Sequence, residues 1–139
     1  MKRFEDQVQL VLYPLALNSR SELATQLALC AGEQGKFWQA HRMLYQRQGQ
    51  WSHLPQPQEQ LLAYSNGLEL DTEALKRCVQ SGRMAKLVKA DQAYARSLQV
   101  RSTPTVFINN QRIVGAQSEA DYVRTIRQEL ARARRHTAP

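Results

Sequence analysis

The sequence predicts an α/β domain, and three features of the chain carry this prediction. Residues 8–13 (VQLVLY) are apolar nearly throughout and are followed by Pro14, which is typical of a strand buried on both faces. Residues 105–108 and 112–115 are two short runs joined by a turn at residues 109–111 (Asn-Asn-Gln), and the second run ends in glycine, which predicts a β-hairpin. Helical periodicity fills most of the chain between them. Strands separated by helices join one sheet through a crossover, so we expect one shared sheet.

Helix signals follow one another along the rest of the chain. Ser19 and Glu22 have the Ser-x-x-Glu spacing of a capping box and predict the first helix start. Asp71 is a good N-cap for a helix over 72–79. Further helices are expected at residues 37–49, 57–64 and 83–98, and after the Ser118-x-x-Asp121 cap. The helix over 83–98 should turn these side chains inward: Met84, Leu87, Val88, Tyr94, Ala95 and Leu98.

Size and charge exclude several classes of protein. The 139 residues suit one domain, and no stretch approaches the ~18–20 apolar residues of a membrane span. Met1-Lys2-Arg3 is basic, but no apolar region follows, so no secretory signal is expected. The net charge of +7 is concentrated at the end of the last helix, where cations complement the helix dipole. We therefore expect no nucleic-acid partner.

The cysteine and histidine content gives no metal site. Cys30 and Cys78 lie 48 residues apart, which matches neither a zinc motif nor Cys-x-x-Cys. Only three histidines are present, so a metal cluster would be hard to assemble. No metal and no cofactor is expected. His41 falls on an apolar helix face and is interpreted as a core histidine.

The Thr103-Pro104 step stands directly before the first hairpin strand. A residue before proline is pushed toward extended geometry, and X-Pro is the one bond that is cis at reasonable frequency. The step is either a plain turn before a strand or a cis-proline loop.

Several ordered blocks of sequence share the order of one known family. The chain resembles the DsbA-like thiol-disulfide oxidoreductases, which are thioredoxin folds with a helical insertion. The resemblance implies one domain over 1–139, with the insertion at about 19–98 and the cis-proline hairpin and last helix at 102–133. The blocks that carry it are residues 8–15, 30–38 with His41 and Leu44, 67–71, and 103–109 with Gly115.

The family opens with a first strand and a Cys-x-x-Cys at the start of its first helix, where the helix N-terminus lowers the pKa of the first thiol. Met1 stands about where that helix would be ending. The resemblance therefore implies an N-terminally truncated domain without its first strand and active-site turn. A fragment, a decayed paralogue and a genuine non-catalytic relative remain as explanations. No catalytic residue is predicted, and whether the protein is an enzyme stays open.

The resemblance also suggests site residues. Thr103 and Pro104 would present backbone to an extended peptide, a form of β-augmentation. Cys30 and Cys78 are either two small buried residues or a structural disulfide that staples the helical insertion.

The implied function is that of a DsbA-like protein thiol-disulfide oxidoreductase domain, inactive as residues 1–139 because Cys-x-x-Cys is absent. The alternative is a non-catalytic peptide-binding or assembly module, and a third interpretation is a glutathione-conjugating or isomerase relative. Extended or unfolded polypeptides are the implied partners, in the bacterial periplasm or elsewhere outside the cytoplasmic membrane. An unpaired edge at residues 8–13 predicts marginal stability or a homodimer.

Overall fold

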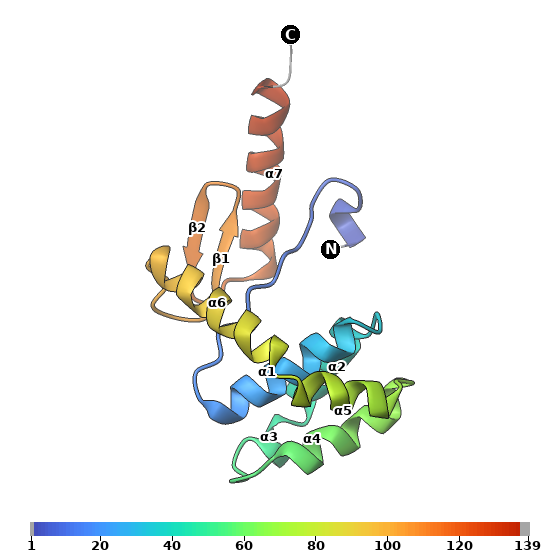
Figure 1. Cartoon of the computed structure of the whole chain (residues 1–139). Helices are drawn as coiled ribbons and strands as arrows, with labels where there is room; N and C mark the ends of the chain where they lie inside the picture. Colours follow the sequence, from blue (N-terminus) through green and yellow to red (C-terminus); the bar gives the residue numbers. More distant parts are fainter. Residues whose placement is uncertain (1, 137–139) are drawn as a thin grey trace. The chain divides into compact units, whose positions relative to one another are not determined.

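A computed structural model describes residues 2–136, which form seven α-helices, two 3₁₀ turns and one β-hairpin (Figure 1). The chain divides into a helical unit over 13–95 and a hairpin unit built from residues 2–12 and 96–136. The elements are η1 (Lys2–Phe4), α1 (Ser19–Gly32), α2 (Phe37–Gln46), α3 (Gln48–Trp51), α4 (Gln58–Tyr64), η2 (Ser65–Leu68), α5 (Thr72–Gln80), α6 (Arg83–Ser97), β1 (Thr105–Ile108), β2 (Gln111–Val114) and α7 (Glu119–His136).

The helical unit is organised around α1, which packs against α2, α4 and α5 (Figure 1). One leucine from each of three helices, Leu27, Leu61 and Leu75, is almost fully buried at the centre. Trp51 is also buried, and its indole Nε1 donates a hydrogen bond to the carbonyl of Leu44 at 2.9 Å. The unit therefore has a continuous apolar core in which the buried indole N–H of Trp51 has a hydrogen-bond partner.

The first helix begins one residue earlier than the Ser-x-x-Glu pattern predicts. Asn18 is the N-cap, and its Oδ1 accepts a hydrogen bond from the backbone N–H of Ser21 at 3.0 Å. Ser21 completes the box, because its Oγ accepts from the N–H of Asn18 at 3.0 Å. The prediction of Ser19 as the cap was wrong, because the side chain of Asn18 caps the helix and Ser19 is its first helical residue. The Asp71 cap is confirmed, with Oδ1 accepting from the N–H of Ala74.

Helix α6 buries less of its apolar face than expected. Val88 is fully buried, whereas Leu87, Tyr94 and Leu98 are exposed. The ring of Tyr94 packs on that of Tyr13 with centroids 5.4 Å apart, so its partner is the irregular segment before α1 rather than a core. The prediction that these three side chains point inward was wrong. Helical spacing shows that they share a face of the helix, but not that another element packs against that face.

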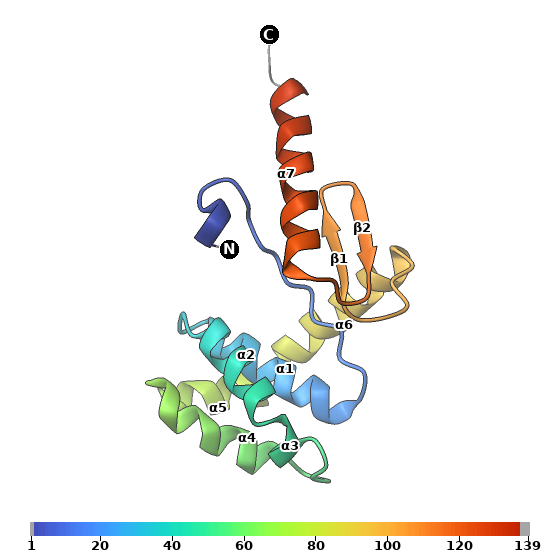
Figure 2. The same ribbon diagram turned by 180° about the vertical axis from the view of Figure 1, so that it is seen from behind.

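In the hairpin unit, β1 and β2 pair antiparallel, with Thr105 opposite Val114 and Ile108 opposite Gln111, which confirms the predicted hairpin. Helix α7 packs against β1 (Figure 2). The buried carboxylate of Glu129 on α7 accepts from Arg132 at 2.6 Å and from the Asn109 side chain at 3.5 Å. Because Asn109 lies in the hairpin turn, this carboxylate joins the turn to the helix.

Residues 8–13 do not form the predicted buried strand. The structure gives residues 8–17 no regular secondary structure, and the four side chains over 10–13 are between 42% and 58% exposed. The sheet within residues 2–136 has two strands, β1 and β2, so no crossover joins residues 8–13 to it. The physical reason is that a strand needs a neighbour for its backbone hydrogen bonds, and these residues have none there.

Candidate functional site

The Thr103-Pro104 loop is held in place from both sides. The peptide bond between the two residues is cis. The carbonyl of Pro104 accepts a hydrogen bond from the N–H of Gly115 at 2.8 Å, which ties the loop to the end of β2. Thr105 Oγ1 donates to the carbonyl of Ser102 at 2.7 Å, which closes the loop on its other side. Thr103 and Pro104 themselves are exposed. The loop is thus a fixed, accessible stretch of backbone.

The backbone of Thr103 is free to bind. Within residues 2–136, no backbone group of Thr103 takes part in a hydrogen bond. Strand β1, which follows it, pairs along one edge with β2 in a sheet of two strands. An extended polypeptide could therefore add to this stretch through main-chain hydrogen bonds.

Arg112 holds the chain segment that precedes this loop. The sequence analysis did not identify it as a site residue. Its guanidinium donates to the carbonyls of Leu98 at 3.1 Å and Gln99 at 2.5 Å. The same group lies 5.7 Å from the ring centroid of Phe107, its cross-strand partner. Arg112 therefore ties the segment that enters the loop to β2. The one sequence signal for it is the pairing with Phe107 across the hairpin.

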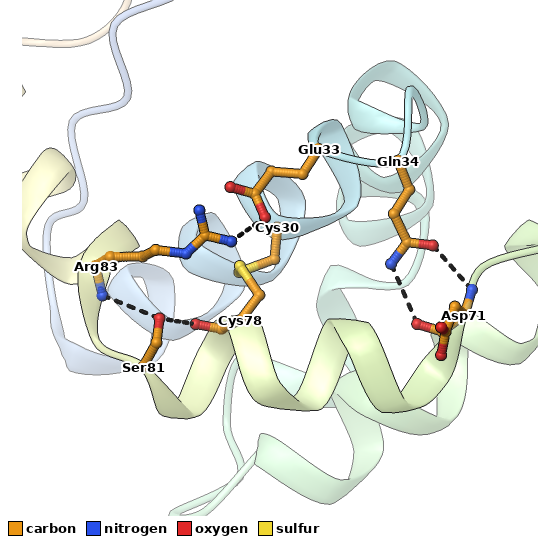
Figure 3. The surroundings of a disulfide bond; sticks show 7 residues. All are labelled: Cys30, Glu33, Gln34, Asp71, Cys78, Ser81 and Arg83. Atoms are coloured by element: carbon orange, nitrogen blue, oxygen red, sulfur yellow. Dashed lines mark hydrogen bonds and ion pairs between the residues drawn. A yellow bond between two sulfur atoms is a disulfide. The ribbon is translucent and has the colours of Figure 1, made fainter.

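Cys30 and Cys78 form a disulfide that joins α1 to α5 (Figure 3). The sulfur atoms are 2.00 Å apart and the Cα atoms 5.8 Å apart. Cys30 is 1% exposed and Cys78 5% exposed. No other cysteine is present in the sequence. In thiol-disulfide exchange a thiolate must reach one of the two sulfur atoms. Because both cysteines are buried, this disulfide is positioned to link the two helices structurally and not to exchange with a substrate.

Polar contacts flank the disulfide at both ends of α5. Gln34 makes a two-way amide contact with Asp71: its Nε2 donates to the Asp71 carbonyl at 3.1 Å and its Oε1 accepts from the Asp71 N–H at 2.8 Å (Figure 3). At the other end, Arg83 forms an ion pair with Glu33 (Figure 3). Glu33 and Gln34, which follow α1, thus hold the N-cap of α5 and the first residue of α6 on either side of the sulfur bridge.

His41 lies among aromatic rings on α2. It stacks on Phe37 with centroids 5.7 Å apart, meets Trp38 edge-on at 5.6 Å and contacts Tyr45 at 4.9 Å. Burial among these rings lowers the pKa of His41 from its usual 6.5, because the charged imidazolium loses hydration. His41 is partly buried and Tyr45 is exposed, so the cluster lies at the edge of the core.

The described residues contain no cluster of three or more potential metal ligands, and none of their helices is long and apolar enough to span a membrane.

A family model described as thioredoxin matches residues 2–128. The chain belongs to this thioredoxin family. Its helices and small antiparallel sheet are consistent with an α/β thioredoxin-like fold. The thioredoxin-family match covers both the Thr103-Pro104 loop and the helical unit with its disulfide.

Curated relatives are much longer than this thioredoxin-family chain. The Na(+)/H(+) antiporter NhaA 1 of Salinispora arenicola is 32% identical over 96 residues, which are 69% of this chain and 14% of that protein. The Na(+)/H(+) antiporter NhaA 3 of Salinispora tropica is 32% identical over 92 residues, which are 66% of this chain and 13% of that protein. The chain thus spans a small part of the relatives it matches. No solved structure matches the chain.

Removing the disulfide should destabilise the helical unit. The Cys30→Ala/Cys78→Ala variant is expected to lower the free energy of unfolding by about 2–4 kcal/mol, because the unfolded chain regains the freedom of a long closed loop. Urea denaturation followed by circular dichroism measures this. Wild-type protein kept in reductant is the matched control and should approach the variant. Equal stability of the oxidised chain and the variant, or free thiols in denatured protein purified without reductant, would contradict the structure.

The lowered pKa of His41 predicts a loss of stability in mild acid. Below about pH 6.5 the unfolded chain binds a proton at His41 before the folded chain does, so stability falls as the pH drops through this range and is fully present above it. The His41→Phe variant keeps an aromatic ring and should remove this part of the pH dependence. Chemical denaturation at a series of pH values tests it. The exposed His53→Phe variant is the control; if it flattens the profile equally, His41 is not responsible.

Proposed function

We propose that this chain is a DsbA-like member of the thioredoxin family whose Thr103-Pro104 loop and β1 edge bind an extended polypeptide. One observation carries the proposal: the backbone of the exposed Thr103 makes no hydrogen bond within the described residues 2–136 and leads into a strand with an unpaired edge. A polypeptide added there would be held by its main chain. Such binding depends little on side-chain identity, so segments of unfolded proteins are the ligands that suit it.

Thiol-disulfide exchange by a DsbA-like protein needs a reactive pair of cysteines, which residues 1–139 do not supply. In thiol-disulfide exchange a thiolate attacks one sulfur of a disulfide, forms a mixed disulfide and releases the other sulfur as a thiolate. A second cysteine then attacks the mixed disulfide, so the pair ends oxidised and the substrate reduced; oxidation of substrate is the reverse. Cys30 and Cys78 do not serve here, because they are bonded to each other and buried. A Cys-x-x-Cys pair next to the bound segment would supply the reacting thiolate.

The second candidate is a non-catalytic peptide-binding module that uses the same edge. Such a module needs only the exposed edge of the described residues and no thiol. Intact mass and N-terminal sequencing of the natural protein separate the two: a product that carries Cys-x-x-Cys supports the oxidoreductase, and a product without it supports the module. The buried disulfide supports an oxidising location for either, such as the bacterial periplasm.

Binding through the backbone of Thr103 can be tested with two substitutions at one position. Thr103→Pro removes the backbone N–H and should weaken binding of a reduced, carboxymethylated and fluorescently labelled polypeptide by about fivefold, the effect of one lost hydrogen bond. Thr103→Ala keeps the N–H and should bind like the wild type. Fluorescence anisotropy measures both. Equal loss in the two variants would assign the effect to the side chain, and no binding by the wild type would refute the proposal.

We also propose that a second copy of the chain pairs along residues 8–12. These residues have no regular secondary structure, and the side chains of Leu10, Val11 and Leu12 are exposed. The N–H of Val8 donates to the carbonyl of Phe4, and residues 9–12 make no backbone–backbone hydrogen bond within residues 2–136. An apolar segment with unpaired backbone groups is a template for strand pairing. An identical segment from another molecule offers the same apolar residues and the same unpaired donors and acceptors, so each copy satisfies the other.

Sedimentation velocity over a range of concentrations tests this pairing. The wild type is expected to shift toward a dimer as concentration rises, and Val11→Pro should stay monomeric because proline lacks the backbone donor. Val11→Thr, which keeps the donor and favours extended backbone, is the matched control and should still dimerise. A wild type that stays monomeric and melts cooperatively at the same temperature at every concentration would rule the dimer out.

A further inference from the structure

A groove of about 540 Å³ lies in the hairpin unit and is lined by residues of the N-terminal segment and of helix α7. Its α7 wall uses one face of the helix, because positions 127, 130, 131 and 134 recur every three or four residues. The volume falls in the range of small-molecule sites. The lining residues are Arg3, Phe4, Gln7, Arg127, Leu130, Ala131, Arg134 and Arg135.

Two arginines of this groove, Arg127 and Arg135, differ from their neighbours on α7 in having no acidic partner within residues 2–136. Outside the groove, Arg124 pairs with Asp121 and Arg132 pairs with Glu129. Among residues 2–136, the side chains of Arg127 and Arg135 make no ion pair or hydrogen bond. Two positive charges therefore line the groove without compensation.

The other two arginines are held by the structure around the groove. Arg134 donates to the Oε1 of Gln7 at 3.2 Å, so the N-terminal segment helps to orient its guanidinium. Arg3 approaches Glu119 at 3.7 Å, a long contact between exposed groups that compensates little. The hairpin unit as a whole has ten basic and five acidic side chains in its sequence, so the surrounding field is also positive.

The floor of the groove is apolar. Phe4 is buried, and Leu130 and Ala131 lie between the two arginines at 127 and 134. Those arginines are two helical turns apart, a rise of about 10 Å. The small side chain of Ala131 leaves room between them. A ligand that fills this space has an anionic end for the guanidinium groups and an apolar body for the floor.

We propose that this groove binds a phosphate ester with an apolar body. A guanidinium binds phosphate through two parallel hydrogen bonds, and several such groups around one small site favour a multiply charged, oxygen-rich anion over a single carboxylate. A free phosphate ester and the headgroup of an anionic phospholipid share this chemistry. The site is separate from the proposed peptide-binding edge, since its lining includes neither Thr103 nor Pro104.

Isothermal titration of the full chain with phenyl phosphate tests the groove. We expect saturable binding to one site that weakens about tenfold in Arg127→Gln and similarly in Arg135→Gln, since each removes a charge-assisted contact. Arg124→Gln is the matched control: it removes the same charge from the same helix outside the groove and should change affinity less than about twofold. Thermal melts of each variant check that it is folded.

A second arm, co-sedimentation with phosphatidylcholine vesicles containing phosphatidic acid, identifies the source of the phosphate. Binding of phenyl phosphate without vesicle binding supports a free ester. Vesicle binding that is lost in Arg127→Gln and kept in Arg124→Gln supports a lipid headgroup. The proposal is overturned if the chain binds neither phenyl phosphate nor the vesicles, or if Arg124→Gln weakens binding as much as Arg127→Gln does. It is also overturned if a DNA duplex displaces phenyl phosphate, because the groove would then be part of a nucleic-acid surface.

Discussion

The disulfide between Cys30 and Cys78 is the constraint on which the arrangement of the helical unit depends. It joins α1 to α5 across 48 residues of sequence and is buried where these helices meet. The Gln34 contact with Asp71 and the ion pair between Arg83 and Glu33 work in the same direction, because they hold the start of α5 and the start of α6 against the end of α1. Both cysteine sulfur atoms of residues 1–139 are bonded to each other.

The hairpin unit is built differently from the helical unit. Of its described residues, only Phe4 and Glu129 are buried, and a two-stranded sheet has little stability of its own. Its order comes from specific polar links: Glu129 to the hairpin turn, Gly115 to Pro104, and Arg112 to the chain before the loop. A fixed loop on a lightly packed unit is suited to binding, because a ligand that adds to the edge supplies contacts that the unit itself lacks.

Features set by neighbouring residues were predictable from the sequence, and features set by distant partners were not. The hairpin and the Asp71 cap follow from turn and capping chemistry within a few residues, and both are present. Residues 8–13 have the composition of a buried strand, but a strand exists only with a partner, and composition says nothing of the partner. Arg112 was missed for the same reason, since its acceptors are more than ten residues away.

The disulfide also changes how the helical unit is connected. Residues 30–78 form a covalent ring closed by sulfur, and α2, α3 and α4 lie entirely within it. A protease that cuts the loop between α3 and α4 opens the ring but separates nothing, because the two pieces stay joined through α1 and α5. Gel electrophoresis without reductant would show such a nicked chain at full length, and only added reductant would reveal the cut.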